Sequence, residues 1–173
     1  LPIKNVDVLE ASLNPDSLFV GSGDIIVVDI ISSTIVSNFD LMIDNTGSIV
    51  IPIIGEINID GLSLSDARIK IRKVIKKHYN HANITILLKK AGFFKIKIIG
   101  PFDHSVFYTV TSFMTVYDVY QTFIAELKRL QQNVNKISSR NIQLLRGNTS
   151  FKLDLLAFNL TGDATQNPFL RRG

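Results

Sequence analysis

The side chains with a capacity for chemistry in this 173-residue chain are its carboxylates, its three histidines and its basic residues, because the sequence contains no cysteine. Hydrolysis of a sugar polymer requires two facing carboxylates. Most acids here stand at positions typical of turns or helix caps, as do Asp24, Asp44, Asp66 and Asp118. His78 and His81 would need further metal ligands from elsewhere, so we expect surface histidines beside a helix C-terminus. The sequence therefore predicts no enzyme, with no catalytic residue, no metal site and no cofactor.

A second candidate for chemistry is the glycine-rich run Gly21-Ser22-Gly23-Asp24. A phosphate loop ends in Gly-Lys-Ser/Thr and opens a helix, whereas this run lacks the lysine and precedes an apolar strand. The chain also contains no Gly-x-Ser-x-Gly nucleophile elbow. We therefore expect these glycines to serve backbone turns.

The elements that would position these residues follow one another most clearly between Leu41 and Ala67. Asp44 and Gly47 bound a predicted turn in which the glycine is free to adopt a positive φ. An apolar strand is predicted over 48–54. Pro52 has no N–H to donate to a sheet, so the strand must lie at an edge or end at this point.

A helix is predicted next, with Ser63 as its N-cap and Asp66 in the capping-box position. Its apolar residues have the spacing of one buried stripe: Leu64, Ala67, Ile71, Val74 and Ile75. Six cations without an intervening acid should fall largely on the opposite, solvent-facing side: Arg68, Lys70, Arg72, Lys73, Lys76 and Lys77.

The rest of the chain reads as a strand pair, a helix and a second strand pair, which suggests a β-grasp. Strands are predicted over 84–89, 94–98, 107–110, 142–145 and 151–155, the last two flanking the turn Gly147-Asn148. Thr115 and Asp118 should cap the helix, whose apolar stripe is Val116, Val119, Tyr120, Phe123, Leu127 and Leu130. We place the boundary between two modules at Ala91-Gly92.

Composition sets limits that agree with two small α+β modules. The chain is 46% hydrophobic, yet no run approaches the roughly 20 uncharged apolar residues of a membrane-spanning helix. A net charge of +4 and a pI near 9.4 favour anionic partners in general. They fall short of a dedicated nucleic-acid-binding arm, so no nucleic acid is expected as a partner.

The turn, strand and helix pattern resembles the bacterial outer-membrane polysaccharide export proteins. The residues that carry the resemblance, in order, are Gly47, Ile49, Pro52, Gly55, Gly61, Leu62, Ser63 and Ala67. Upstream, the run from Phe19 to Asp24 is similar to the family's aromatic-x-Leu-Gly-Pro-Gly-Asp motif, with Ser22 where proline is usual. The resemblance implies an N-terminal extension over 1–18 and an export domain over 19–91 with strands and one helix.

Residues 92–173 resemble the soluble-ligand-binding β-grasp (SLBB) module that follows the export domain in this family. The matching segments are 98–100, 115–119, 140–146, 154–155, 162–163 and 167–168. The chain departs from the family at Ala125–Leu130, where helix-forming residues replace a small Ala-Gly-Gly turn, so the helix should run longer. A further strand would be expected after Gly173, which suggests a truncated module.

The resemblance implies a transport role without catalysis: the periplasmic portion of a homo-oligomeric outer-membrane channel for capsular or extracellular polysaccharide. Expected partners are sister subunits, the polysaccharide, an inner-membrane polysaccharide copolymerase, and the outer membrane through segments absent from this chain, including a lipidated N-terminal cysteine. The signature turn residues are expected to be structural: Gly21, Gly23, Asp24, Gly47, Pro52, Gly55, Gly61 and Gly100. Tentative polymer or subunit contacts are Arg68, Arg72, Lys73, Lys76 and Lys77.

Other interpretations remain open at this point. The basic helix face is either a solvated surface or a contact for acidic polysaccharide, anionic lipid head groups or an acidic neighbour. Arg171 and Arg172 are expected to be tail charges, and core or subunit packing should claim Phe93, Phe94, Phe102 and Phe113. The alternative function is a monomeric carbohydrate-binding β-grasp module of the periplasm. A nucleic-acid binder is suggested by the pI alone.

Overall fold

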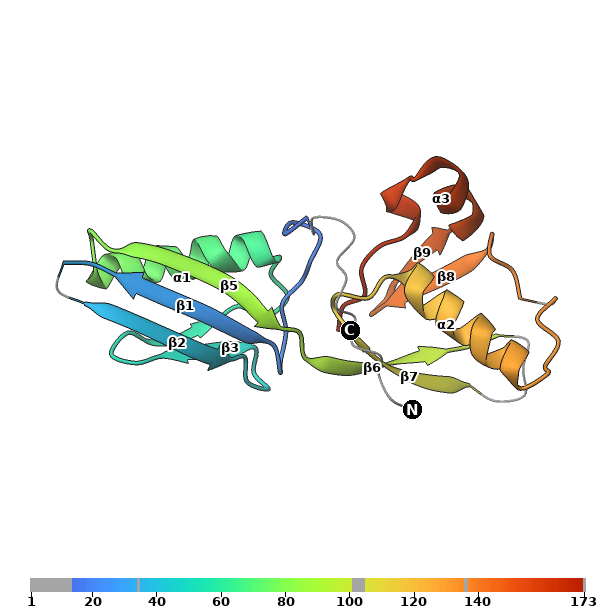
Figure 1. Ribbon diagram of the computed structural model, residues 1–173, viewed down its shortest axis with the longest axis horizontal. Helices are drawn as coiled ribbons and strands as arrows, with labels where there is room; N and C mark the ends of the chain where they lie inside the picture. Colours follow the sequence, from blue (N-terminus) through green and yellow to red (C-terminus); the bar gives the residue numbers. More distant parts are fainter. Residues whose placement is uncertain (1–13, 34, 101–104, 136, 173) are drawn as a thin grey trace.

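The computed structural model describes residues 14–33, 35–100, 105–135 and 137–172. These residues form two modules that follow one another along the long axis of the molecule (Figure 1). Each module has its own buried cluster of apolar side chains. Short helices pack on small sheets in both, so the predicted α+β class with two small mixed modules is confirmed. Phe102 lies outside the described residues.

The first module is built on a three-stranded antiparallel sheet in the order β2-β1-β5. These strands are β1 (Ile25–Ile31), β2 (Val36–Met42) and β5 (Asn83–Lys90). The central strand β1 alternates as a half-buried strand should, with Ile26, Val28 and Ile30 buried in the core. The prediction of a strand over 84–89 is confirmed, and β2 and β5 form the two edges of this sheet.

A separate hairpin of β3 (Ser48–Ile51) and β4 (Gly55–Asn58) follows the predicted turn. Gly47 has φ 79°, as predicted. The strand ends at Ile51, directly before Pro52, which confirms that the proline marks a strand end and shortens the range predicted to reach residue 54. Ile53 and Gly55 both adopt positive φ values as the chain reverses into β4.

Helix α1 (Leu64–His78) covers the sheet (Figure 1) and begins at the predicted cap. Ser63 Oγ accepts from Asp66 N at 3.1 Å and donates to the Asp66 carboxylate at 2.8 Å. Leu64, Ala67, Ile71 and Ile75 are buried and Val74 is partly buried, so the predicted apolar stripe is confirmed. Leu18, which the sequence places in an N-terminal extension, is packed in the same core and is 1% exposed.

The second module begins with an antiparallel pair, β6 (Phe93–Ile98) and β7 (Val106–Thr111), followed by α2 (Val116–Arg129). Thr115 and Asp118 form the complete predicted capping box. The helix does run on through Ala125, as its sequence predicts. Leu130 is the exception to the predicted apolar stripe: it lies at the C-cap, just after the last residue of the helix, and is 52% exposed.

The hairpin of β8 (Ile142–Arg146) and β9 (Thr149–Leu153) turns at Gly147-Asn148 as predicted. Within the described residues, β6-β7 and β8-β9 are two separate two-stranded sheets. The β-grasp assignment therefore stays a prediction.

The predicted extension of the last strand to Leu155 is wrong. Asp154 instead caps a helix, α3 (Leu155–Thr161), by accepting from Ala157 N at 2.9 Å, and Leu155 becomes a fully buried core residue at the start of that helix. A 3-10 turn, Ala164–Gln166, comes next. Leu170 then returns to the core of this module, where its N–H donates to Met114 O at 2.8 Å.

Candidate functional site at the junction of the two modules

The junction is organised by the carboxylate of Asp24, which is 2% exposed. One of its oxygens accepts from Gly21 N at 2.9 Å, which closes the tight turn before β1. The other accepts from Gly92 N at 2.6 Å, 68 residues further along the chain. Asp24 therefore ties the first strand of one module to the point where the chain crosses into the other.

Burial raises the pKa of the Asp24 carboxyl. The two backbone N–H donors and the nearby Arg172 guanidinium act in the opposite direction, but desolvation outweighs them. A buried carboxylate held by backbone donors is a structural tie, and both of its oxygens are occupied. The structural role expected of Asp24 stays a prediction.

At Gly92, where the chain passes from the first module to the second, the backbone of Gly23 and Asp24 lies too close for any side chain. A Cβ atom at this position would lie 2.6 Å from Gly23 C and 2.9 Å from Asp24 N. Gly23 itself has φ 83°, a conformation that favours glycine. The two backbones thus approach each other this closely because Gly92 carries no side chain, whereas a Cβ atom on Gly23 would lie 3.6 Å from Gly92 Cα, an ordinary contact distance.

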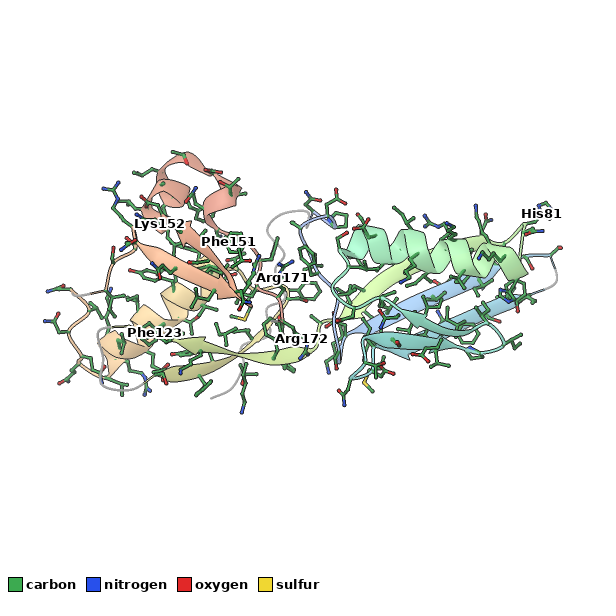
Figure 2. The ribbon with its side chains drawn as sticks, turned by 180° about the vertical axis from the view of Figure 1, so that it is seen from behind. His81, Phe123, Phe151, Lys152, Arg171 and Arg172 are labelled. Atoms are coloured by element: carbon green, nitrogen blue, oxygen red, sulfur yellow. The ribbon has the colours of Figure 1, made fainter. Side chains whose placement is uncertain are left out.

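Arg171 and Arg172 do not behave as tail charges, and that prediction is wrong. Figure 2 shows both side chains between the two modules. Arg172 donates to Phe93 O at 2.8 Å and to Ser22 O, and its guanidinium lies 5.3 Å from the centre of the Phe94 ring. The Arg171 guanidinium lies 4.6 Å from the centre of the Phe19 ring. The C-terminal segment therefore returns to the first module, and its two arginines connect that module to the second.

Replacing Arg172 by glutamine is expected to loosen the two modules, because a shorter neutral side chain cannot bond both carbonyls. Hydrogen bonds to charged groups contribute about 1.5–3 kcal/mol each to stability when well buried. Because Arg172 is exposed, each of its bonds should contribute no more than the lower value. Small-angle scattering should show a broader distribution of particle lengths for Arg172→Gln. The matched variant Arg129→Gln removes an exposed charge at the end of α2 and should leave the distribution unchanged. Equal distributions for Arg172→Gln and the wild type would contradict this role.

A cleft of about 490 Å³ opens between the modules at this point. Its lining combines apolar, basic and acidic side chains from both sides: Phe19, Val20, Asp24, Asp60, Phe94, Ser112, Arg146, Arg171 and Arg172. Arg146 reaches it from β8 and donates to Phe169 O at 2.5 Å. Sequence reasoning missed this cleft because its basic residues come from distant segments.

The signature turn residues divide between several places. Gly21, Asp24 and Gly61 line the cleft, and Gly23 lies beside it, where a Cβ atom would be 3.7 Å from Arg172 Nη2. Gly47 supports the base of the β3-β4 hairpin, and Pro52 and Gly55 form its tip. Gly100 is exposed beyond the end of β6. Of the signature turn residues, the structure therefore brings together only the four at the cleft: Gly21, Gly23, Asp24 and Gly61.

The basic face of α1 does not contribute to the cleft lining. Arg72, Lys73, Lys76 and Lys77 are exposed, as predicted for a solvent-facing side. Arg68 differs from that prediction, since it is half-buried and its Nε is buried without a hydrogen-bond partner among the described residues. The helix leads to exposed His81 at the far end of its module (Figure 2).

Comparison with known proteins identifies the first module. Residues 13–89 match the model of the family described as polysaccharide biosynthesis/export protein. This part of the chain is therefore similar to that family. The match supports a role in polysaccharide export, and it begins upstream of Leu18, consistent with the burial of that residue in the core of the export module. A search of curated proteins gave no match.

Two further observations concern the described residues. No helix among them has the length and apolar character needed to cross a membrane. No group of three or more histidine, aspartate or glutamate side chains among them is arranged to hold a metal ion. His78 is exposed, and its Nδ1 lies 3.3 Å from Val74 O in the preceding helical turn.

Proposed function

We propose that this chain is the periplasmic part of an oligomeric outer-membrane channel through which capsular or extracellular polysaccharide is exported. The family match of the first module carries the proposal. In this role the protein conducts the polymer passively and performs no catalysis. Its partners are further copies of itself, the polysaccharide and an inner-membrane polysaccharide copolymerase.

The surface of the export module supports association between copies. Strand β2 is an edge of its sheet, and its two terminal side chains, Val36 and Met42, are 81% and 65% exposed. Ile53, at the tip of the β3-β4 hairpin, is 90% exposed. An open strand edge flanked by apolar side chains favours pairing with another chain. A head-to-tail contact of this kind closes into a ring when the rotation between copies is suitable.

The test is made in a bacterium that lacks the gene for this protein and receives it back on a plasmid. We expect wild-type protein to restore surface polysaccharide and to give a ladder of oligomers after chemical cross-linking in the periplasm. Val36→Lys should weaken both, because it places a charge at the apolar end of the edge strand. Leu160→Lys is the matched control, since Leu160 is 77% exposed on α3 in the other module.

Two results would overturn the proposal: normal surface polysaccharide in the deleted strain, or cross-linking that yields only monomer from the wild-type protein. Monomer with saturable glycan binding would instead favour a carbohydrate-binding module of the periplasm. The cleft between the modules is the observation that favours this second candidate, because concave sites of about 300–1,000 Å³ are typical of small-ligand binding.

A further inference from the structure

The cleft between the modules holds three arginines, Arg146, Arg171 and Arg172, whose guanidinium groups have no carboxylate within ion-pairing distance among the described residues. We propose that this cleft binds a carboxylate-bearing sugar unit of an acidic polysaccharide, with Arg171 as its principal anion contact. The polymer class rests on the proposed export function, whereas the anion contact rests on the geometry of the cleft.

Arg171 is the arginine of the cleft whose N–H donors make no hydrogen bond to the described residues. Its guanidinium lies over the Phe19 ring, with 4.6 Å from Cζ to the ring centre, and it makes no hydrogen bond to any described residue. A guanidinium presents five N–H donors in a fork that matches a carboxylate. Arg172 and Arg146 are already bound to backbone carbonyls, so they contribute mainly charge.

The positive charges in the cleft are only partly compensated. Arg146 and Arg171 line the same cleft, and burial, followed by the nearby charge of Arg171, lowers the pKa of the Arg146 guanidinium. Two acids also line the cleft, Asp60 and, beside Arg172, Asp24, so the three arginines outnumber the carboxylates by one. Asp60 is exposed. An anion in the cleft would relieve the repulsion between the arginines.

The remaining lining suits a sugar better than a bare inorganic anion. Phe19, Val20 and Phe94 provide apolar wall, and the volume of about 490 Å³ exceeds what a single small anion fills. Ser112 also lines the cleft, and its buried Oγ has no hydrogen-bond partner among the described residues. Such a hydroxyl is available to a ligand that reaches the floor of the cleft.

The test uses the purified 173-residue chain and three probes in calorimetric titrations: hexagalacturonate, the neutral hexamer maltohexaose, and inorganic phosphate. We expect saturable binding of hexagalacturonate that weakens with added salt, and no binding of maltohexaose. Arg171→Gln should weaken hexagalacturonate binding roughly tenfold, the size of one charge-assisted hydrogen bond at a partly exposed site. Arg129→Gln removes the same charge from the exposed end of α2, away from the cleft lining, and should leave binding unchanged.

A second measurement does not depend on any variant. In a protein labelled with ¹⁵N at arginine, the Nε–H signal of Arg171 should shift on titration with hexagalacturonate, while that of Arg129 stays in place.

The proposal is overturned by any of three results. These are no saturable hexagalacturonate binding, equal weakening by Arg129→Gln and Arg171→Gln, or phosphate binding as tight as hexagalacturonate binding. Because these titrations use purified protein, their failure is distinct from a failure of the export and cross-linking experiments in cells.

Discussion

Replacing Gly47 by alanine is expected to destabilise the export module by about 2–5 kcal/mol, from backbone strain and overpacking together. Gly47 has φ 79°, which an L-residue adopts only at a cost. The added Cβ atom would also lie 2.2 Å from Asp60 Cβ and 3.0 Å from Asp60 Cα. The space is therefore closed by a neighbouring residue's backbone and the root of its side chain, which cannot move aside by changing rotamer.

The measurement is thermal unfolding followed by calorimetry, where Gly47→Ala should lower the Tm of the first module by at least roughly 10 °C. Gly55→Ala is the matched control in the same hairpin. Gly55 also has a positive φ, 105°, but a Cβ atom there would meet nothing within 4 Å. This variant should show the strain alone, at about 1–2 kcal/mol. Equal shifts for the two variants would contradict the steric part of the argument.

The reason for this sensitivity is that Gly47 joins the two ends of the hairpin. Its carbonyl accepts from Ile59 N at 2.8 Å, just after β4, while the Asp44 carboxylate holds the turn before β3 through Thr46 N and Ser48 N. A shift of Gly47 away from Asp60 would therefore disturb both ends together. This explains physically why a glycine stands at this position.

Sequence reasoning succeeded where a structure depends on neighbours in the chain. Ser63 and Thr115 were identifiable as caps because each bonds a residue three positions away. The positive φ of Gly47 was predictable from its turn. The error at Leu155 arose because Phe151, Leu153 and Leu155 alternate like a strand, while Asp154 between them is also a good N-cap, and the cap prevailed.

The junction was not predictable in the same way, because its contacts join residues far apart in the chain. Arg172 bonds the carbonyls of Ser22 and Phe93, which are 150 and 79 positions away. Two consecutive arginines near the end of a chain carry no pattern that distinguishes them from a solvated tail. For Asp24, the local bond to Gly21 matches the predicted turn, but nothing in the sequence indicates its second bond to Gly92.

Asp24→Ala is expected to have the other large effect, because it leaves two buried N–H groups, of Gly21 and Gly92, without an acceptor. Each orphaned donor costs about 1–3 kcal/mol, so we expect a loss of about 2–5 kcal/mol in chemical denaturation. The loss should also free the crossing between the modules, since Gly92 is bound to the first module through this carboxylate. Faster hydrogen exchange at Gly21 and Gly92 is the direct measurement.

Asp44→Ala provides the matched control, because Asp44 also accepts backbone hydrogen bonds, from Thr46 at 2.8 Å and Ser48 at 3.0 Å, but is exposed. Water can replace its carboxylate there, so the variant should lose clearly less stability than Asp24→Ala. If the two variants were equally destabilised, burial of the Asp24 carboxylate would not be what makes it important. If Gly92 kept its slow exchange in Asp24→Ala, the tie between the modules would have to lie with Arg172, whose bonds to Ser22 and Phe93 span the same crossing.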